Sequence, residues 1–140
     1  MMFNRFVQPD VDLDTLTIRP RMDLSAPFEL RLPLRWMAIL RGRVAASLAA
    51  STGVQSSDDI VKLLLTGADA VMVTSAFLRS GPELARELVE GLATWLESHE
   101  YEGVLQMKGS LSQENSPDPS AFERAHYMAA LTRYVWEEGW

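Results

Sequence analysis

The spacing of apolar residues changes several times in the first third of the chain, and each change predicts a different element. Residues 1–6, MMFNRF, are typical of the end of a strand, which Pro9 closes. Residues 11–18 alternate imperfectly between apolar and polar, which predicts a short strand or an extended arm. Three prolines between residues 20 and 33 favour a loop. A helix follows, with Pro33 near its start and Gly42 past its end.

The centre of the chain has the pattern of a strand, a helix and a second strand. Residues 44–51 and 70–75 are short apolar runs, which predict strands buried on both faces. Between them, Ser57 is expected to cap a helix whose first turn carries two aspartates and which Gly67 ends. Short connections around one helix indicate a βαβ unit, so we expect the two strands to be parallel.

The last part of the chain is predicted to be helical. A helix that begins after Gly81 and Pro82 and runs to about Glu97 places apolar residues on one face and is expected to cover the sheet; these residues are Leu84, Leu88, Val89, Leu92, Trp95 and Leu96. A short helix is expected within residues 101–111 and a terminal helix after residue 120, with a loop between them.

Composition narrows the class of protein. The 140 residues are 47% hydrophobic, which suits one core and therefore one domain over residues 1–140. The chain has no cysteine and no apolar run long enough for a membrane span, so we expect a cytoplasmic protein without a membrane partner. A net charge of −6 argues against a broad nucleic-acid surface.

Candidate chemistry lies where the two predicted strands end. Residues 51–54 (STGV) follow the first strand and residues 74–77 (TSAF) follow the second. At the carboxyl ends of parallel strands, backbone N–H groups and hydroxyls from such loops can converge on a phosphate. Ordinary turn chemistry explains the same residues, and Ser75 would then simply cap the next helical turn. His99 and His126 are expected to be solvated and packed, respectively, and no metal site is predicted.

Taken together, residues 52–112, from TGVQSSDDIVKLLLTGADAVMVTSAF to YEGVLQMKGSLS, resemble the C-terminal region of the dihydroorotate dehydrogenase family. The similarity continues through FNRF, RLPLRWMAILRGR and the tail SQENSPDPSAFERAHYM, so it covers almost the whole chain. The family fold is a (β/α)8 TIM barrel that carries FMN at the carboxyl ends of its strands, with the flavin phosphate held after the last two strands.

The resemblance assigns roles to particular residues. It implies FMN-phosphate binding by two loops, namely Thr52, Gly53 and Val54 and then Thr74, Ser75 and Ala76, while Asn4 would contact substrate or flavin. Thr52 and Thr74 stand where the family has glycines, which adds bulk where backbone must approach a phosphate. No residue here matches the family's flavin-site lysine or its Cys or Ser general base, so no catalytic residue is assigned.

A complete barrel takes about 250 residues, so the chain is expected to hold only its last strand-helix units. Our first hypothesis is the C-terminal part of an FMN-dependent oxidoreductase of pyrimidine biosynthesis, which acts on CH–CH groups of a small pyrimidine-like substrate. It would work with the missing N-terminal half of the barrel or a second copy of the chain, and a homo-oligomer is expected. The alternative is a truncated, non-catalytic barrel remnant that binds no flavin and acts only as an associating scaffold.

Overall fold

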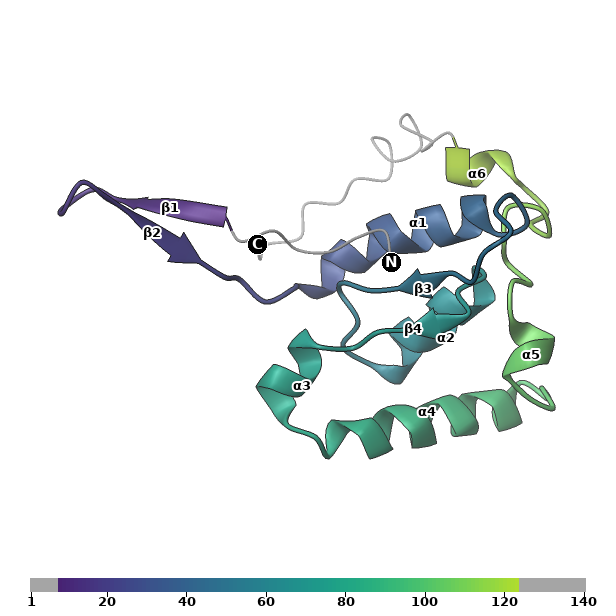
Figure 1. Cartoon of the computed structure of the whole chain (residues 1–140). Coiled ribbons are helices and arrows are strands. Elements are labelled where there is room, and N and C mark those ends of the chain that lie inside the picture. The colour runs from purple at the N-terminus through teal and green to yellow at the C-terminus, as the bar shows by residue number, and fades with distance from the viewer. Residues whose placement is uncertain (1–7, 124–140) are drawn as a thin grey trace, which may run out of the picture.

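The computed structural model describes residues 8–123. The strand predicted at the N-terminus, with Asn4, and most of the predicted terminal helix, with His126, lie outside the described residues. Within them, short strands and longer helices form a mixed α/β unit from which one hairpin projects (Figure 1).

The predicted βαβ unit is confirmed, with shorter strands than expected. Strand β3 (Ala49–Ala50) pairs in parallel with β4 (Ala70–Val71), and α2 (Ser57–Leu65) connects them. The ladder continues at both ends, where the Leu48 carbonyl accepts from the Asp69 N–H at 2.7 Å and the Ala50 carbonyl accepts from the Met72 N–H at 2.8 Å. The small alanines bring the helices close to the strands, and turns and bends occupy residues 41–46.

Helix α2 is the centre of the packing, because a hydrophobic cluster lies on each side of it. On one side, Met37 of α1 (Arg31–Leu40) and Ala50 of β3 pack with Leu63. On the other side, Val61 and Leu64 pack with residues of α4 and α5, including Leu92, Trp95 and Met107. Figure 1 shows α1 and α4 lying on opposite sides of α2 and the strands.

The N-terminal cap of α2 differs by one residue from the prediction. Ser56, rather than Ser57, is the capping residue, and its Oγ accepts from the Asp59 N–H at 3.4 Å. The Asp59 carboxylate accepts in return from the N–H groups of Ser56 and Gln55, at 3.1 and 3.0 Å. This reciprocal arrangement is a capping box, and Gly67, with φ of 114°, follows the helix as predicted.

The segment before α1 is more ordered than its prolines predict. Strands β1 (Gln8–Asp12) and β2 (Thr17–Arg21) form an antiparallel hairpin. Residues 11–18, predicted as one short strand or extended arm, therefore hold the end of β1, the turn and the start of β2. Pro9 and Pro20 are tolerated because a two-stranded sheet has only edge strands. A 3-10 helix, η1 (Pro27–Leu30), then leads directly into α1, so the loop predicted over residues 20–33 is confined to residues 22–26.

The later helices follow the predicted order. They are α3 (Ser75–Ser80), α4 (Leu84–Ser98), α5 (Val104–Met107) and α6 (Ser120–Glu123). Helix α4 buries Leu88, but Val89 is 67% exposed and was wrongly assigned to the apolar face. The helix also packs chiefly on α2 instead of directly on the sheet.

Candidate functional site at the carboxyl ends of the strands

The two loops predicted to bind phosphate leave the same edge of the sheet. Strands β3 and β4 are parallel neighbours, so residues 51–56 and residues 72–74 both emerge at the carboxyl ends. In a parallel α/β fold this edge carries the ligand sites.

A third segment that sequence reasoning missed also reaches this edge. Ser25, at the root of the hairpin, is buried, and its Oγ forms a hydrogen bond with the Ser75 Oγ. Its carbonyl accepts from Gln55 Nε2 at 3.3 Å and from Arg79 Nη1 at 3.1 Å. Ser75 therefore bonds across the edge and does not cap α3, whose N-cap residue is Thr74 without a side-chain cap bond.

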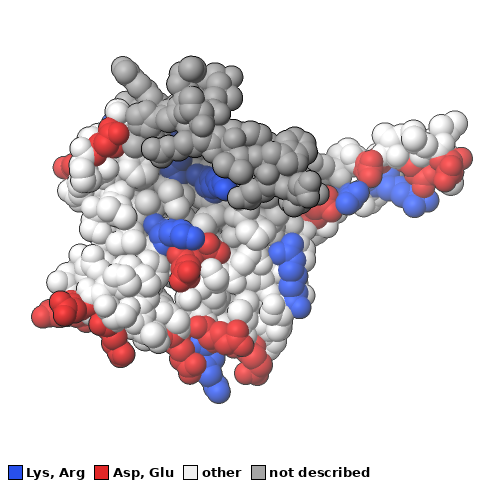
Figure 2. All heavy atoms as spheres, turned by 180° about the vertical axis from the view of Figure 1, so that it is seen from behind, with Lys and Arg blue, Asp and Glu red and all other residues white. Residues whose placement is uncertain are grey.

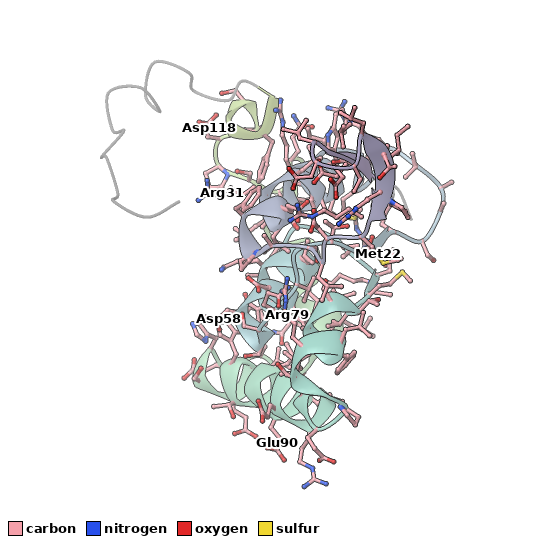
Figure 3. All side chains as sticks on the ribbon, turned by 90° about the vertical axis from the view of Figure 1, so that its left-hand side faces the viewer. Met22, Arg31, Asp58, Arg79, Glu90 and Asp118 are labelled. Atoms are coloured by element: carbon pink, nitrogen blue, oxygen red, sulfur yellow. The ribbon has the colours of Figure 1, made fainter. Side chains whose placement is uncertain are left out.

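Arg79 of α3 joins the three segments. Its Nη1 also donates to Gln55 Oε1 at 3.1 Å, and its Nη2 donates to the Leu24 carbonyl at 3.4 Å. Figure 3 places Arg79 in the middle of this edge, between α3 and the elements above it. The guanidinium brings a positive charge to the candidate phosphate site, and its position one helical turn after Ser75 was the signal that could have identified it.

Backbone conformation in the first loop requires glycine at one position and favours it at another. Gly53 has φ of 80°, and a Cβ there would lie 2.3 Å from the backbone N of Leu30. Thr52 also has a left-handed φ, of 84°, which is an outlier for a β-branched residue. Thr52 thus holds a glycine-like conformation where the resemblance places a family glycine.

The structure separates accessible candidates from buried ones. Thr74 is exposed, and Thr52 and Ser75 are partly exposed, so these three hydroxyl residues can meet a ligand from solvent. Gly53, Val54 and Ala76 are buried, so their side chains and Cα atoms lie beneath the surface at this edge of the sheet. Beside Thr74, an open apolar cavity of about 370 Å³ is lined by Val73, Thr74, Phe77, Leu78, Pro82 and Ala85.

The opposite edge of the sheet holds a cluster of charges with a structural role. The Asp69 carboxylate accepts from Lys108 Nζ at 2.7 Å, from the Leu48 N–H at 2.8 Å and from Arg41 Nη1 at 3.1 Å. The Lys108 hydrogen bond first, and then that of the Leu48 N–H, lower the pKa of Asp69 from 3.8 to about 2. Because these partners come from separate elements, the cluster ties β3, α1 and the segment after α5 together.

Other classes of site find little support in the described residues. Residues 8–123 contain no group of three or more His, Cys, Asp or Glu side chains that could hold a metal ion, and His99 instead stacks on Trp95 with ring centroids 4.0 Å apart. On the face in Figure 2, basic side chains are scattered among acidic ones instead of forming one patch. Among the helices of residues 8–123, none is long and apolar enough to cross a membrane.

Comparison with known proteins identifies partial relatives. No family model matches the chain. It is 42% identical over 55 residues to the putative dihydroorotate dehydrogenase A (fumarate) of Aeropyrum pernix, covering 39% of this chain and 18% of the relative. It is 32% identical over 89 residues to the catalytic subunit of dihydroorotate dehydrogenase B (NAD(+)) of Pelobacter propionicus, covering 63% of this chain and 29% of the relative.

The chain thus spans less than a third of the length of these curated relatives. The resemblance predicted from the sequence is confirmed over 39% to 63% of this chain. The chain is homologous over part of its length to dihydroorotate dehydrogenases, and this partial homology implies that its α/β unit corresponds to part of a TIM barrel.

Proposed function

We propose that this chain is the C-terminal part of an FMN-dependent dihydroorotate dehydrogenase-like oxidoreductase and contributes the phosphate-binding side of the flavin site. The observation that carries the proposal is the convergence of three segments at one strand edge, joined by the Ser25–Ser75 bond and by Arg79. Partial homology to dihydroorotate dehydrogenases supports the same assignment.

The residues at this edge fit the phosphate end of FMN. Thr74 is exposed and Thr52 and Ser75 are partly exposed, and Arg79 brings a positive charge to Ser25, the residue that bonds to Ser75. Hydroxyl donors and a guanidinium are the groups that proteins use to bind phosphate. Gly53, Val54 and Ala76 are buried, so they can hold the neighbouring accessible residues in position.

The residues of this chain suggest roles in binding FMN, while the redox chemistry would come from FMN itself. FMN, when bound, supplies the redox chemistry of hydride transfer from a small pyrimidine-like substrate such as dihydroorotate. Thr74 and Ser75 hold the phosphate, and Arg79 keeps their loop in place through Gln55 and Ser25. The family's lysine and general base have no counterpart among these residues, so the chain contributes only the phosphate side of the site, and the rest of a barrel or a second chain would complete it. By resemblance to the family, Asn4 would contribute to binding of substrate or flavin.

The test is a titration of the purified chain with FMN, followed by quenching of flavin fluorescence. Saturable binding that inorganic phosphate displaces is expected. Thr74→Asp places a carboxylate at the proposed phosphate position while keeping a good N-cap residue for α3, so it should weaken binding at least tenfold. Thr94→Asp makes the same change on the exposed part of α4 and should bind FMN as the unmodified chain does.

The alternative is a barrel remnant that binds no flavin and acts by association alone. It is favoured by the large apolar side chains that residues 8–123 expose, among them Leu78 at 67% and Leu105 at 83%. A folded chain that fails to bind FMN would select this alternative.

A further inference from the structure

The β1–β2 hairpin is connected to the helices of the chain through residues 22–26, which we call the hairpin root. Every residue of its two strands except Asp12 is exposed. Arg19 pairs with Asp12, and Arg21 pairs with Asp10 at 3.4 Å, so these charges bond within the hairpin. Figure 1 shows the hairpin projecting away from the helices. The direction in which it projects therefore depends on how the root is held.

Both segments of the candidate site hold the hairpin root. Ser25 is 4% exposed, and its Oγ forms a hydrogen bond with Ser75 Oγ, from the segment that follows β4. Its carbonyl accepts from Gln55 Nε2, in the segment that follows β3, at 3.3 Å and from Arg79 Nη1 at 3.1 Å. Arg79 Nη2 also donates to the Leu24 carbonyl at 3.4 Å. The root is thus bonded to both segments that leave the strand edge.

The hydrogen bond between Ser25 and Ser75 has a direction that a bound phosphate would set. Each hydroxyl has a single proton, and either serine can donate in the pair as it stands. Ionised phosphate oxygens only accept hydrogen bonds, so Ser75 must donate its proton to a phosphate that it binds. Ser25 must then donate to Ser75. Because hydrogen bonds in a chain polarise one another, the two bonds strengthen each other.

Arg79 adds an electrostatic contribution at the same place. Its acceptors are the carbonyls of Ser25 and Leu24 and the amide oxygen of Gln55, and all three are uncharged. These bonds do not neutralise the positive charge of the guanidinium, so a phosphate at Ser75 would attract it. Since the same guanidinium bonds to the root, a phosphate at this edge favours the arrangement in which the root is held.

We propose that Ser25 is a positioning residue that couples phosphate binding at the strand edge to the order of the hairpin root. The inference rests on the proposed function, because it requires the phosphate of FMN at Ser75. A bound phosphate fixes the Ser25–Ser75 pair in one direction and thereby holds the root, and with it the hairpin, in one orientation. By linkage, holding the root raises the affinity for the phosphate by the same factor. The orientation of the hairpin then depends on whether the site is occupied.

Hydrogen–deuterium exchange of the full 140-residue chain, followed by mass spectrometry, tests this inference. Saturating FMN or inorganic phosphate should slow amide exchange in residues 22–26 at least threefold. Riboflavin lacks the phosphate group and should leave this exchange unchanged. Ser25→Ala should raise the dissociation constant for FMN about fivefold, as expected for the loss of one hydrogen bond. At saturating FMN, the root of this variant should exchange as fast as it does without ligand.

Ser112→Ala is the matched control, because it removes another buried hydroxyl, whose Oγ has no hydrogen-bond partner within residues 8–123. It should keep the FMN affinity and the slowed exchange of the unmodified chain. Saturable FMN binding without slower exchange at the root would overturn the inference and leave the proposed function standing, as would a Ser25→Ala chain that keeps the response. A chain that binds no FMN would overturn both. The comparison of FMN with riboflavin uses the unmodified chain, so it tests the inference even if Ser25→Ala fails to fold.

Discussion

Lys108 Nζ lies 2.7 Å from Asp69 Oδ1, and this contact joins the segment after α5 to the residue that precedes β4. Asp69 also accepts the N–H of Leu48, which precedes β3. One carboxylate therefore fixes the start of both parallel strands, at the edge opposite the candidate site.

The Asp69 cluster predicts a loss of stability in acid. The folded-state pKa of Asp69 is lowered to about 2 from 3.8, so the ionised carboxylate stabilises the fold. This contribution, about 2 kcal/mol, is fully present above the unfolded-state pKa and disappears as the pH falls through the folded-state pKa. Between pH 4 and pH 2, Asp69→Asn should show a smaller drop in its urea midpoint than the unmodified chain. Asp14→Asn, at an exposed turn residue, is the control and should follow the unmodified chain. If the urea midpoint fell equally with pH in all three proteins, the pKa of Asp69 would not be lowered by its partners in the folded state.

Leu88 is the buried residue of α4, with 5% of its surface exposed. Leu88→Ala should lower the free energy of unfolding by about 2 to 5 kcal/mol, because it leaves a cavity between α4 and the elements it covers. Its neighbour Val89 is 67% exposed, so Val89→Ala should change stability by less than about 0.5 kcal/mol. Chemical denaturation measures both, and similar midpoints for the two variants would contradict the packing of α4.

Gly53 and Gly81 allow steric overlap to be separated from backbone strain. Their φ angles are 80° and 82°, but a Cβ at Gly53 would overlap the backbone of Leu30 whereas one at Gly81 would meet nothing within 4 Å. Gly81→Ala should therefore cost about 1 kcal/mol from strain alone, and Gly53→Ala should cost clearly more. Thermal unfolding of both variants tests this difference. Because of the overlap, a substitution at Gly53 disturbs the fold and is a poor probe of flavin binding.

Thr52 holds a left-handed φ of 84° that glycine adopts without strain. Thr52→Gly should raise the free energy of unfolding by about 1 kcal/mol, as relief of strain exceeds the added entropy of the unfolded chain. Thr94→Gly, inside helix α4, should instead lower it by about 1 kcal/mol. A destabilised Thr52→Gly variant would indicate that the contacts of the threonine side chain outweigh the strain.

The local patterns of the sequence predicted the central unit well. The apolar runs, the acidic first turn of α2 and Gly67 identified two parallel strands and the helix between them, because these signals act within a few residues. The strands are shorter than predicted because alanine-rich runs such as residues 44–50 are apolar without being strongly β-forming.

The sequence did not reveal contacts between distant segments. Ser25 and Ser75 lie 50 residues apart, and no periodicity connects them. The hairpin was missed because its turn carries leucines instead of the usual glycine or asparagine, so residues 11–18 resembled one strand. Ser56 and Ser57 are adjacent and chemically equal, and only backbone geometry decides which of them caps α2.

The central claim is that the carboxyl edge of the strands binds the phosphate of FMN, and a fluorescence titration of FMN into the unmodified, Thr74→Asp and Thr94→Asp chains tests it most directly. The proposal predicts saturable quenching that inorganic phosphate displaces, at least tenfold weaker in Thr74→Asp and unchanged in Thr94→Asp. A folded chain that gives no saturable quenching, or equal affinity in all three proteins, would contradict it.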